Sequence, residues 1–398
     1  MNHDETLFPA LASLLAPFDV RAFVDAYWER APLHVSRPGG PALLTLSELD
    51  AIITTGLHRH PDLTLADAAR PVEADDYSSP EGFVDTPKAI KRFGEGASIV
   101  LNRLDEWSPR VRDLCVRLEA ELGFGAQANL YLTPGGAQGF PVHYDSHDVI
   151  IVQCEGRKRW RLYDMPVGLP MQGEHFDRDR VTPGPLTATF ETCPGDALYI
   201  PRGLMHDAVA VDGQSSLHVT VGIHAVRWSA LLIEAIAKAS LTDPELRRGI
   251  APGTLVRGDD ASMQAALRAH AERAARSLRW EPVREHYTAR LRGDHKESLS
   301  GMLLDVARSF DEGAIFEVRT GVLAAVSLEG EAVILSVNGR GTRWPSHAES
   351  TLRRALALGR FSLEDLGDDL DLAGRATLVR RLVSEGAVRT AAPRIVPA

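Results

Sequence analysis

The sequence predicts an α+β protein in which a small β-barrel is followed by a helical region and then by a second mixed unit. Three observations support this prediction. Residues 129–163 alternate between short strand patterns and turns. From residue 228 the apolar residues have helical spacing, and strand patterns return only after about residue 314. At 398 residues the chain is long enough for two or three domains, which we predict over 1–226, 227–305 and 306–398.

Composition narrows the functional classes. The hydrophobic content of 44% and the charged content of 25% are typical of a soluble globular protein. A formal net charge of −10 argues against a general nucleic-acid-binding role, which would need a basic surface, and slightly favours a basic protein or peptide as substrate. Three cysteines without a C-x-x-C pattern fit a reducing compartment, so we expect a cytoplasmic location. No run of eighteen apolar residues and no targeting segment is present, so we expect no membrane contact.

The first 122 residues predict the elements that precede the barrel. Thr45 and Glu48 form a capping-box pattern at the start of one helix. Ser108-Pro109 begins an amphipathic helix, because proline is favoured at the first helical position and apolar residues follow on one face. We expect helices over 20–28, 46–53, 87–93 and 109–122, strands over 32–35 and 98–101, and irregular loops over 54–86.

A candidate metal site lies in His143-Tyr144-Asp145. Residues two apart on a strand point to the same face, so His143 and Asp145 can reach one ion. Two histidines and one carboxylate form the ligand set of non-haem Fe(II) oxygenases. The chain holds 14 histidines, so about one H-x-D is expected by chance. Two others, His60-Pro61-Asp62 and His175-Phe176-Asp177, have no surrounding strand pattern, and we interpret them as turn and loop residues.

The sequence after this motif predicts a hairpin. The apolar run 149–152 is typical of a strand buried on both faces. Glu155-Gly156 offers a turn, and residues 158–163 alternate as a returning strand. Residues 164–186 predict a long loop over the site.

A third ligand is expected from a later strand. Residues 197–200 predict a strand, and Pro201-Arg202-Gly203 predicts a bend immediately before His206. His218 and His224 compete for the same role, on or after a strand over 215–222 that closes the barrel. The P-G-D…I-P-R-G context favours His206.

Three motifs together resemble a known family. They are H-Y-D at 143–145, V-I-I-V-Q-x-x-G-R-K-R-W-R-L-Y at 149–163, and P-G-D-A-L-Y-I-P-R-G-x-x-H at 194–206. The pattern is similar to the JmjC-type cupin oxygenases and most similar to the ribosomal oxygenases, which hydroxylate ribosomal proteins with Fe(II), 2-oxoglutarate and O2. The resemblance implies a double-stranded β-helix, the cupin/JmjC jelly roll, for the barrel.

The resemblance also implies roles for particular residues. His143, Asp145 and His206 would bind Fe(II), and Lys158 would pair with the distal carboxylate of 2-oxoglutarate. The alternative for Lys158 is one charge on a solvated R-K-R edge. The same comparison places Asn129 and Tyr131 in the pocket, in a pattern closer to the histidyl-hydroxylating than to the arginyl-hydroxylating ribosomal oxygenases. His218 and Thr220 either line the 2-oxoglutarate pocket or are core polar residues.

The helical region over 227–305 predicts amphipathic helices, with helically spaced apolar residues after Trp228 and an Ala- and Arg-rich stretch over 263–280. In the ribosomal oxygenases the matching region mediates dimers, so the resemblance implies a homodimer. The alternative is a helical bundle that only caps the barrel.

The last unit predicts a winged-helix-like domain. Such a domain often binds DNA through a basic helix. Residues 361–386 hold six acidic and three basic residues, which argues against phosphate contact, so we expect a protein-contact role. We predict strands over 315–319 and 332–337 and helices over 352–358, 361–366 and 373–385.

Three functions follow as hypotheses. The first is hydroxylation of a ribosomal protein at a histidyl or arginyl residue. The second is the same chemistry on another peptide or a natural-product precursor. The third is a cupin regulator without catalysis. The intact ligand set with Lys158 argues against the third, and formation of succinate would separate it from the other two.

Overall fold

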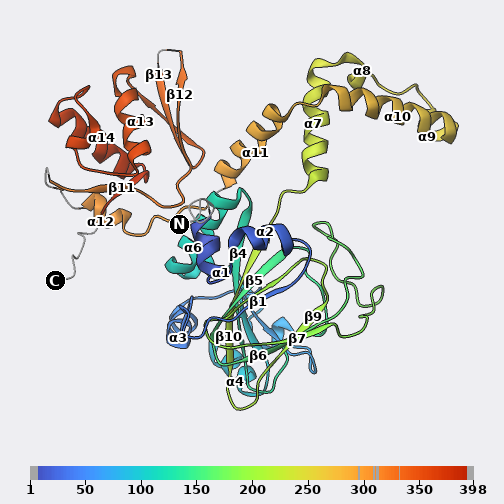
Figure 1. Ribbon diagram of the computed structural model, residues 1–398. Coiled ribbons are helices and arrows are strands. Elements are labelled where there is room, and N and C mark those ends of the chain that lie inside the picture. The colour runs from blue at the N-terminus through green and yellow to red at the C-terminus, as the bar shows by residue number, and fades with distance from the viewer. Residues whose placement is uncertain (1–7, 295, 308–309, 311–312, 331, 392–398) are drawn as a thin grey trace. The chain divides into compact units, whose positions relative to one another are not determined.

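A computed structural model describes residues 8–294, 296–307, 310, 313–330 and 332–391 of the chain. Contacts divide the chain into two compact units (Figure 1). One unit combines Met1–His224 with His295–Ala398, and the other is Ala225–Asp294. The predicted domain boundaries themselves stay a prediction.

Two antiparallel sheets form the N-terminal barrel (Figure 1). The larger sheet has seven strands in the order β1-β8-β5-β10-β4-β3-β2, and the smaller has three in the order β7-β6-β9. The strands are β1 (Leu33–Val35), β2 (Leu63–Ala66), β3 (Ser98–Leu101), β4 (Gly125–Thr133), β5 (Asp148–Glu155), β6 (Lys158–Leu162), β7 (Ala188–Thr192), β8 (Ala197–Ile200), β9 (His206–Ala210) and β10 (Ser216–His224).

Strand β5 is buried on both faces, as its apolar run predicts. Val149 and Ile151 pack in the small core that also contains Trp160 of the smaller sheet. Ile150 and Val152 point the other way, into the main core beneath the N-terminal helices. Successive side chains of a strand point to opposite faces, so β5 contributes side chains to both cores.

Helices pack against the outer face of the larger sheet and supply the rest of the main core. The capping box of Thr45 and Glu48 forms as predicted, and Ser108 caps the helix that begins at Pro109. The prediction of irregular structure over 54–86 was wrong in part, because β2 pairs with β3 there. The helices are α1 (Pro9–Leu15), α2 (Val20–Ala26), α3 (Leu46–Thr55), α4 (Thr86–Gly94), α5 (Leu104–Trp107) and α6 (Pro109–Leu122), with a short 3-10 turn η1 (Ala74–Asp76).

The second unit contains only helices among its described residues, as predicted for this region. Many of its large apolar side chains are exposed, including Trp228 (79%), Ile233 (70%) and Leu255 (86%). Across the described ranges, no helix combines the length and the hydropathy needed to cross a membrane. Its helices are α7 (Trp228–Thr242), α8 (Pro244–Arg247), α9 (Thr254–Arg257), α10 (Asp260–Ser277) and α11 (Trp280–Asp294).

The C-terminal domain combines two small sheets with helices around its own core. The prediction of a helix over 361–366 was wrong in part, because only the short 3-10 turn η3 (Glu364–Leu366) is helical there. Phe361 pairs with Phe316 in a sheet, and Ser362 and Asp365 then form a turn. The elements are α12 (Met302–Ala307), β11 (Phe316–Val318), β12 (Ala324–Glu329), β13 (Ala332–Val337), β14 (Arg340–Trp344), η2 (Ser346–Ala348), α13 (Glu349–Leu358), β15 (Arg360–Phe361), η3 (Glu364–Leu366), α14 (Leu372–Ser384) and β16 (Val388–Thr390). Whether this domain is a winged helix stays a prediction.

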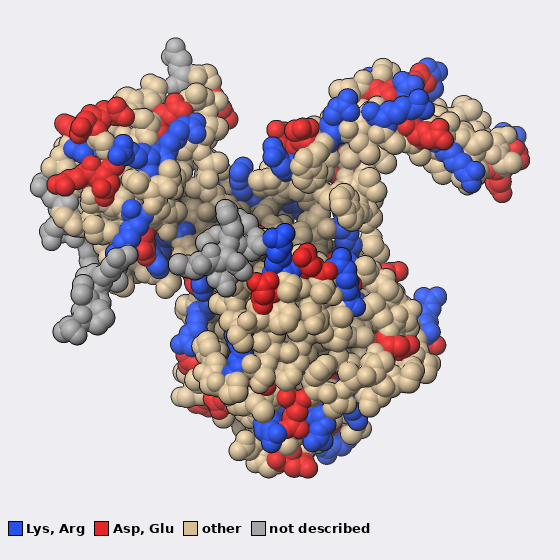
Figure 2. All heavy atoms as spheres, viewed as in Figure 1, with Lys and Arg blue, Asp and Glu red and all other residues tan. Residues whose placement is uncertain are grey.

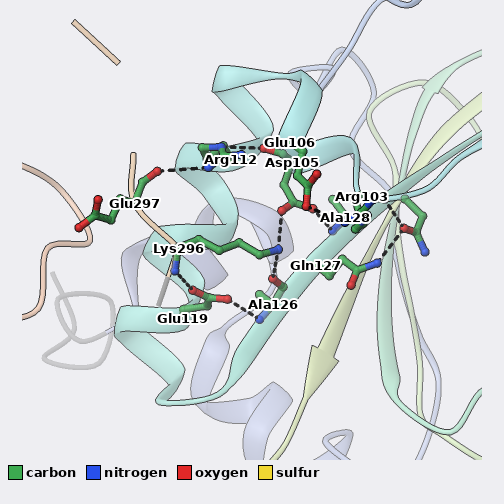
Figure 3. A network of polar contacts seen from close by, with 11 residues as sticks. Arg103, Asp105, Glu106, Arg112, Glu119, Ala126, Gln127, Ala128, Lys296 and Glu297 are labelled. Carbon is green, nitrogen blue, oxygen red and sulfur yellow. Dashed lines mark hydrogen bonds and ion pairs between the residues drawn. The ribbon is translucent and has the colours of Figure 1, made fainter. Parts of the chain in front are cut away.

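A polar network ties the start of this C-terminal segment to the barrel (Figure 3). Lys296 forms an ion pair with Asp105 of α5, whose carboxylate is fully buried. The other oxygen of Asp105 accepts the backbone N–H of Ala128 in β4 over 3.1 Å. Glu119 of α6 accepts the N–H groups of Ala126 and Lys296. One cation thus helps to fix β4, the strand that carries several predicted site residues.

Candidate metal centre

Three side chains from two segments of the barrel meet at one point. Each of His143, Asp145 and His206 offers a ligand atom, and these atoms lie within 4.8 Å of one another. His143 and His206 face each other because their backbones form an isolated antiparallel bridge. The two imidazole rings are 4.7 Å apart, and His206 Nε2 lies 3.7 Å from Asp145 Oδ2. His218 and His224 are outside this group.

Both histidines are oriented for ligation by their second nitrogen. Nδ1 of His143 lies 2.8 Å from the carbonyl oxygen of Pro141, and Nδ1 of His206 lies 3.0 Å from that of Leu204. A carbonyl can only accept, so each Nδ1 carries the proton and each Nε2 keeps its lone pair.

The electrostatics of this group also suit a cation. Burial, together with His143, lowers the pKa of His206 to about 4, so the ring is neutral at pH 7. Burial opposes ionisation of Asp145, but the neighbouring His206 and His143 hold its pKa below the ordinary value. Two neutral imidazoles and one carboxylate are the form in which such residues bind a metal.

A cavity of about 250 Å³ lies between the two sheets and is lined by all three residues. The larger sheet contributes Tyr131, His218 and Thr220, and the smaller contributes Lys158 and Trp160. Its lining residues come from strands β3 to β6, β9 and β10, which lie far apart in the sequence. It is a site that only the closed barrel can form.

Lys158 lies inside this cavity, with only 5% of its surface exposed. Its ammonium group donates to Thr133 Oγ1 over 3.1 Å and lies 5.7 Å from the ring of Trp160. Burial lowers the pKa of Lys158 to about 7, and no carboxylate among the described residues pairs with it. Arg157 and Arg159 point to the opposite face, where both bind Glu191 and are about half exposed. The alternation predicted for this strand is confirmed.

Tyr131, His218 and Thr220 also reach the cavity. The rings of Tyr131 and His218 stack at 4.9 Å, and that of Trp160 meets His218 edge-on. Burial, with Lys158 nearby, holds the pKa of His218 well below its ordinary value, and its Nδ1 has no hydrogen-bond partner within the described structure. A buried nitrogen without a partner is rare in a folded protein, which makes His218 a candidate for contact with a molecule bound in the cavity that it lines.

Asn129 is placed differently from the prediction. It follows the same face of β4 as Tyr131 but does not line the cavity. Its side-chain oxygen accepts the backbone N–H of Arg103 over 3.0 Å and the amide of Gln127 over 3.2 Å. In this structure the Asn129 amide fixes the loop before α5.

Sequence reasoning missed several residues of the cavity. Thr133 lies two positions beyond Tyr131 on β4 and accepts the hydrogen bonds of both Lys158 and Ser98. The period of two along this strand could have identified it. Phe140 lies in the Gly- and Pro-rich segment between β4 and β5, and its ring contacts those of Tyr131 and His143.

The two other H-x-D motifs lie in a turn and in a loop. Residues 60–62 form a turn, where Asp62 pairs with Arg103. Residues 175–177 belong to the long loop over 164–186, where no helix or strand forms. The ring of Phe176 meets that of Tyr144 at 5.6 Å, so this loop packs on the residue between two predicted ligands.

Comparison with known proteins agrees with this geometry. The family model of the JmjC domain matches residues 102–231. The chain is 34% identical over 238 residues to the bifunctional lysine-specific demethylase and histidyl-hydroxylase NO66 of Dictyostelium discoideum, covering 58% of this chain and 46% of that protein. It is 31% identical over 234 residues to ribosomal oxygenase 2 of Rattus norvegicus, covering 56% of this chain and 50% of that protein. The chain thus spans about half the length of these curated relatives.

A solved structure shares the fold over nearly the whole chain. The crystal structure of Escherichia coli ribosomal oxygenase YcfD superimposes with a TM-score of 0.54 at 19% identity, covering 94% of this chain and 98% of that one. Residues 102–231 of this protein therefore match a JmjC domain, and its barrel is a JmjC/cupin β-sandwich with added helices that is similar in fold to a ribosomal oxygenase.

Proposed function

We propose that this protein is an Fe(II)- and 2-oxoglutarate-dependent oxygenase that hydroxylates a side chain of a ribosomal protein. The observation that carries the proposal is one cavity that holds both a His-Asp-His group and a buried, carboxylate-free lysine. The first needs a divalent cation, and the second needs an anion. Structures of YcfD are described as complexes with cobalt and succinic acid and with cobalt and 2-oxoglutarate, which are guests of these two kinds.

The residues present fit these groups. His143 and His206 offer Nε2, and Asp145 offers a carboxylate oxygen, which is the facial ligand set of Fe(II) oxygenases. When bound, the iron and 2-oxoglutarate supply the oxidation of the substrate, with release of succinate and CO2.

The chain's own residues bind and orient these groups. Lys158 would hold the distal carboxylate of 2-oxoglutarate, and Thr133 fixes the position of the lysine. His218 and Thr220 line the same cavity, and the unpartnered Nδ1 of His218, in the tautomer that carries its proton there, can donate to a bound carboxylate. The apolar side chains of Trp160 and Ile151 also line the cavity and would exclude water from it.

The substrate class rests on the relatives. One is named as a lysine-specific demethylase and histidyl-hydroxylase and the other as a ribosomal oxygenase, which favours a histidyl acceptor in a ribosomal protein. An arginyl acceptor rests on the resemblance to the ribosomal oxygenases. Tyr131 lies in the cavity beside the ligands and is suited to contact the acceptor side chain. Another peptide or a natural-product precursor is the second candidate, and a regulator without catalysis is disfavoured by the intact site.

Mass spectrometry tests the function directly. Ribosomal proteins from cells with this chain should carry one added oxygen atom on a single protein, and those from cells without it should not. Cells that express the Asp145→Ala variant at the same level are the control and should resemble the deletion. The purified protein should form succinate only with Fe(II) and 2-oxoglutarate. Absence of succinate under these conditions would support the regulator instead.

We also infer a homodimer that is formed through the helical unit. The exposed apolar side chains of α7, α9 and α10 form more apolar surface than a solvated helix needs, and a second copy of the same unit would cover it.

Introducing one charged residue into the proposed interface tests the homodimer. Ile233→Glu should weaken the dimer by roughly tenfold or more, because a buried, unpaired carboxylate costs more than 1.4 kcal/mol. Size-exclusion chromatography with light scattering across a wide concentration range would measure it. Leu57→Glu, an equally exposed apolar position on the barrel, is the control and should leave the dimer intact. A wild-type chain that is monomeric at every concentration would contradict the proposal.

For the C-terminal domain we propose protein contact and no direct binding of nucleic acid. Acidic and basic side chains are interspersed over it (Figure 2), which does not favour binding to a phosphate backbone.

A cytoplasmic location would place the enzyme beside its ribosomal substrate, and the three free cysteines are compatible with it.

A further inference from the structure

A buried ion pair lies between the two chain segments that carry the predicted metal ligands. Asp148 begins β5, just after Asp145, and Arg202 lies in the bend before His206. Arg202 Nη1 donates to Asp148 Oδ2 over 2.8 Å, and the two side chains are 7% and 0% exposed. Neither residue lines the cavity or belongs to the ligand group.

Backbone hydrogen bonds hold the two segments together on the ligand side. His143 and His206 exchange two of them, of 3.0 and 2.8 Å, and Gly203 donates to the carbonyl of Asp145 over 2.9 Å. The spacing of all three ligands therefore depends on how these two segments lie against each other.

The backbone ladder is interrupted at the bend. Strands β5 and β8 pair through Val149 and Ile200, but Pro201 then turns the chain. At this point the Asp148 side chain replaces the missing backbone pairing. Its Oδ1 accepts the backbone N–H of Arg202 over 3.4 Å. Together with the ion pair to Oδ2, one carboxylate binds both the backbone and the side chain of Arg202.

Further contacts fix this pair in place. Tyr199 donates its hydroxyl hydrogen to Asp148 Oδ1 over 2.7 Å, and the same hydroxyl accepts the N–H of Glu29 over 2.8 Å. The Glu29 carboxylate also pairs with Arg202. The pair is thus anchored to the chain after α2 as well as to both ligand segments.

We propose that Asp148 and Arg202 are positioning residues that set the distance between the His143/Asp145 segment and His206. The inference rests on the proposed metal centre and concerns how its geometry is maintained. Hydrogen bonds to ionised groups are roughly twice as strong as neutral ones. Replacing Asp148 or Arg202 by a neutral residue would therefore weaken the contact between the two ligand segments. Residues that support a metal site without touching the ion typically change its affinity by about 10–100-fold.

Cobalt titration of the full-length protein tests the proposal, with the visible absorption of Co(II) as the readout. Arg202→Met should raise the Kd for Co(II) by about tenfold or more, and Arg202→Lys should recover part of the loss. The matched control is Arg319→Met, which breaks a 2.8 Å ion pair of similar burial with Asp305 in the C-terminal domain. That variant should lose thermal stability and keep the wild-type cobalt affinity.

The double variant Asp148→Asn/Arg202→Met separates positioning from stability, because neither member of the pair is left as an unpaired buried charge. It should still bind cobalt more weakly than the wild type. Wild-type affinity in a folded Arg202→Met or double variant would overturn the positioning role. A wild-type protein that binds no cobalt would instead overturn the metal centre on which that role depends.

Discussion

Replacing His143, Asp145 or His206 by alanine should abolish metal binding and 2-oxoglutarate turnover while the fold is retained. The three ligand atoms lie within 4.8 Å of one another on two segments whose backbones are joined independently of the side chains. Loss of one ligand removes a third of the protein's coordination, but the bridge between residues 143 and 206 persists. Cobalt titration, succinate formation and the circular dichroism of each variant would measure the three effects.

His218→Ala is the control for the ligand assignment. His218 is buried in the same cavity but lies outside the ligand group, so this variant should still bind Co(II). Its affinity for 2-oxoglutarate should fall if its free nitrogen bonds the cosubstrate. Retained activity in His206→Ala together with lost metal in His218→Ala would show that the third ligand was assigned wrongly.

Lys158→Ala should raise the apparent KM for 2-oxoglutarate by about two orders of magnitude or more. Removing one partner of a buried ion pair costs roughly 3–5 kcal/mol, and each 1.4 kcal/mol corresponds to tenfold. Lys158 is 5% exposed, so solvent does little to screen this interaction. The affinity for Co(II) should barely change, because the lysine is not a ligand. Steady-state kinetics of succinate formation would separate the two effects.

Two neighbouring variants sharpen this prediction. Lys158→Arg keeps the charge but is bulkier, so it should retain part of the activity. Arg157→Ala removes a cation on the opposite, solvent-exposed face of β6 and should be nearly silent. Equal effects at Arg157 and Lys158 would mean that the cosubstrate carboxylate is held elsewhere.

The pH dependence of cosubstrate binding should follow Lys158. Burial lowers the pKa of this ammonium to about 7 in the ligand-free protein. Below pH 7 the group is charged and ready to bind a carboxylate. Above pH 7 a proton must be taken up first, so the Kd for 2-oxoglutarate should rise by up to tenfold per pH unit. A guanidinium stays protonated, so Lys158→Arg should lack this dependence.

Local sequence determined most of the barrel and the residues at its centre. The apolar run 149–152 predicted a strand buried on both faces, and β5 has that burial. The alternation over 158–163 put Lys158 inside and its arginine neighbours outside, as observed. His143 and Asp145 were predicted to share one face because residues two apart on a strand point the same way, and the structure places His206 beside them.

The tertiary structure decided the features that depend on partners distant in sequence. Asn129 lies on the same face of β4 as Tyr131, but its side-chain oxygen accepts the backbone N–H of Arg103 and the residue does not line the cavity. Phe361 lies in a segment that local sequence predicted as a helix, yet pairing with Phe316 makes it a strand residue. Pairing across a sheet outweighs local propensity, and a pattern within one segment contains no information about which strand will lie beside it.

The same reason explains why the sequence did not reveal the Asp148–Arg202 pair. Each residue is an ordinary charge in its own segment, beside a strand or in a bend. Their meeting depends on the pairing of β5 with β8, which brings positions 148 and 202 together. The sequence by itself therefore predicted which groups could bind a metal and an anion. Only the closed barrel decided which buried contacts hold them at a common site, because that requires the register of strands far apart in the chain.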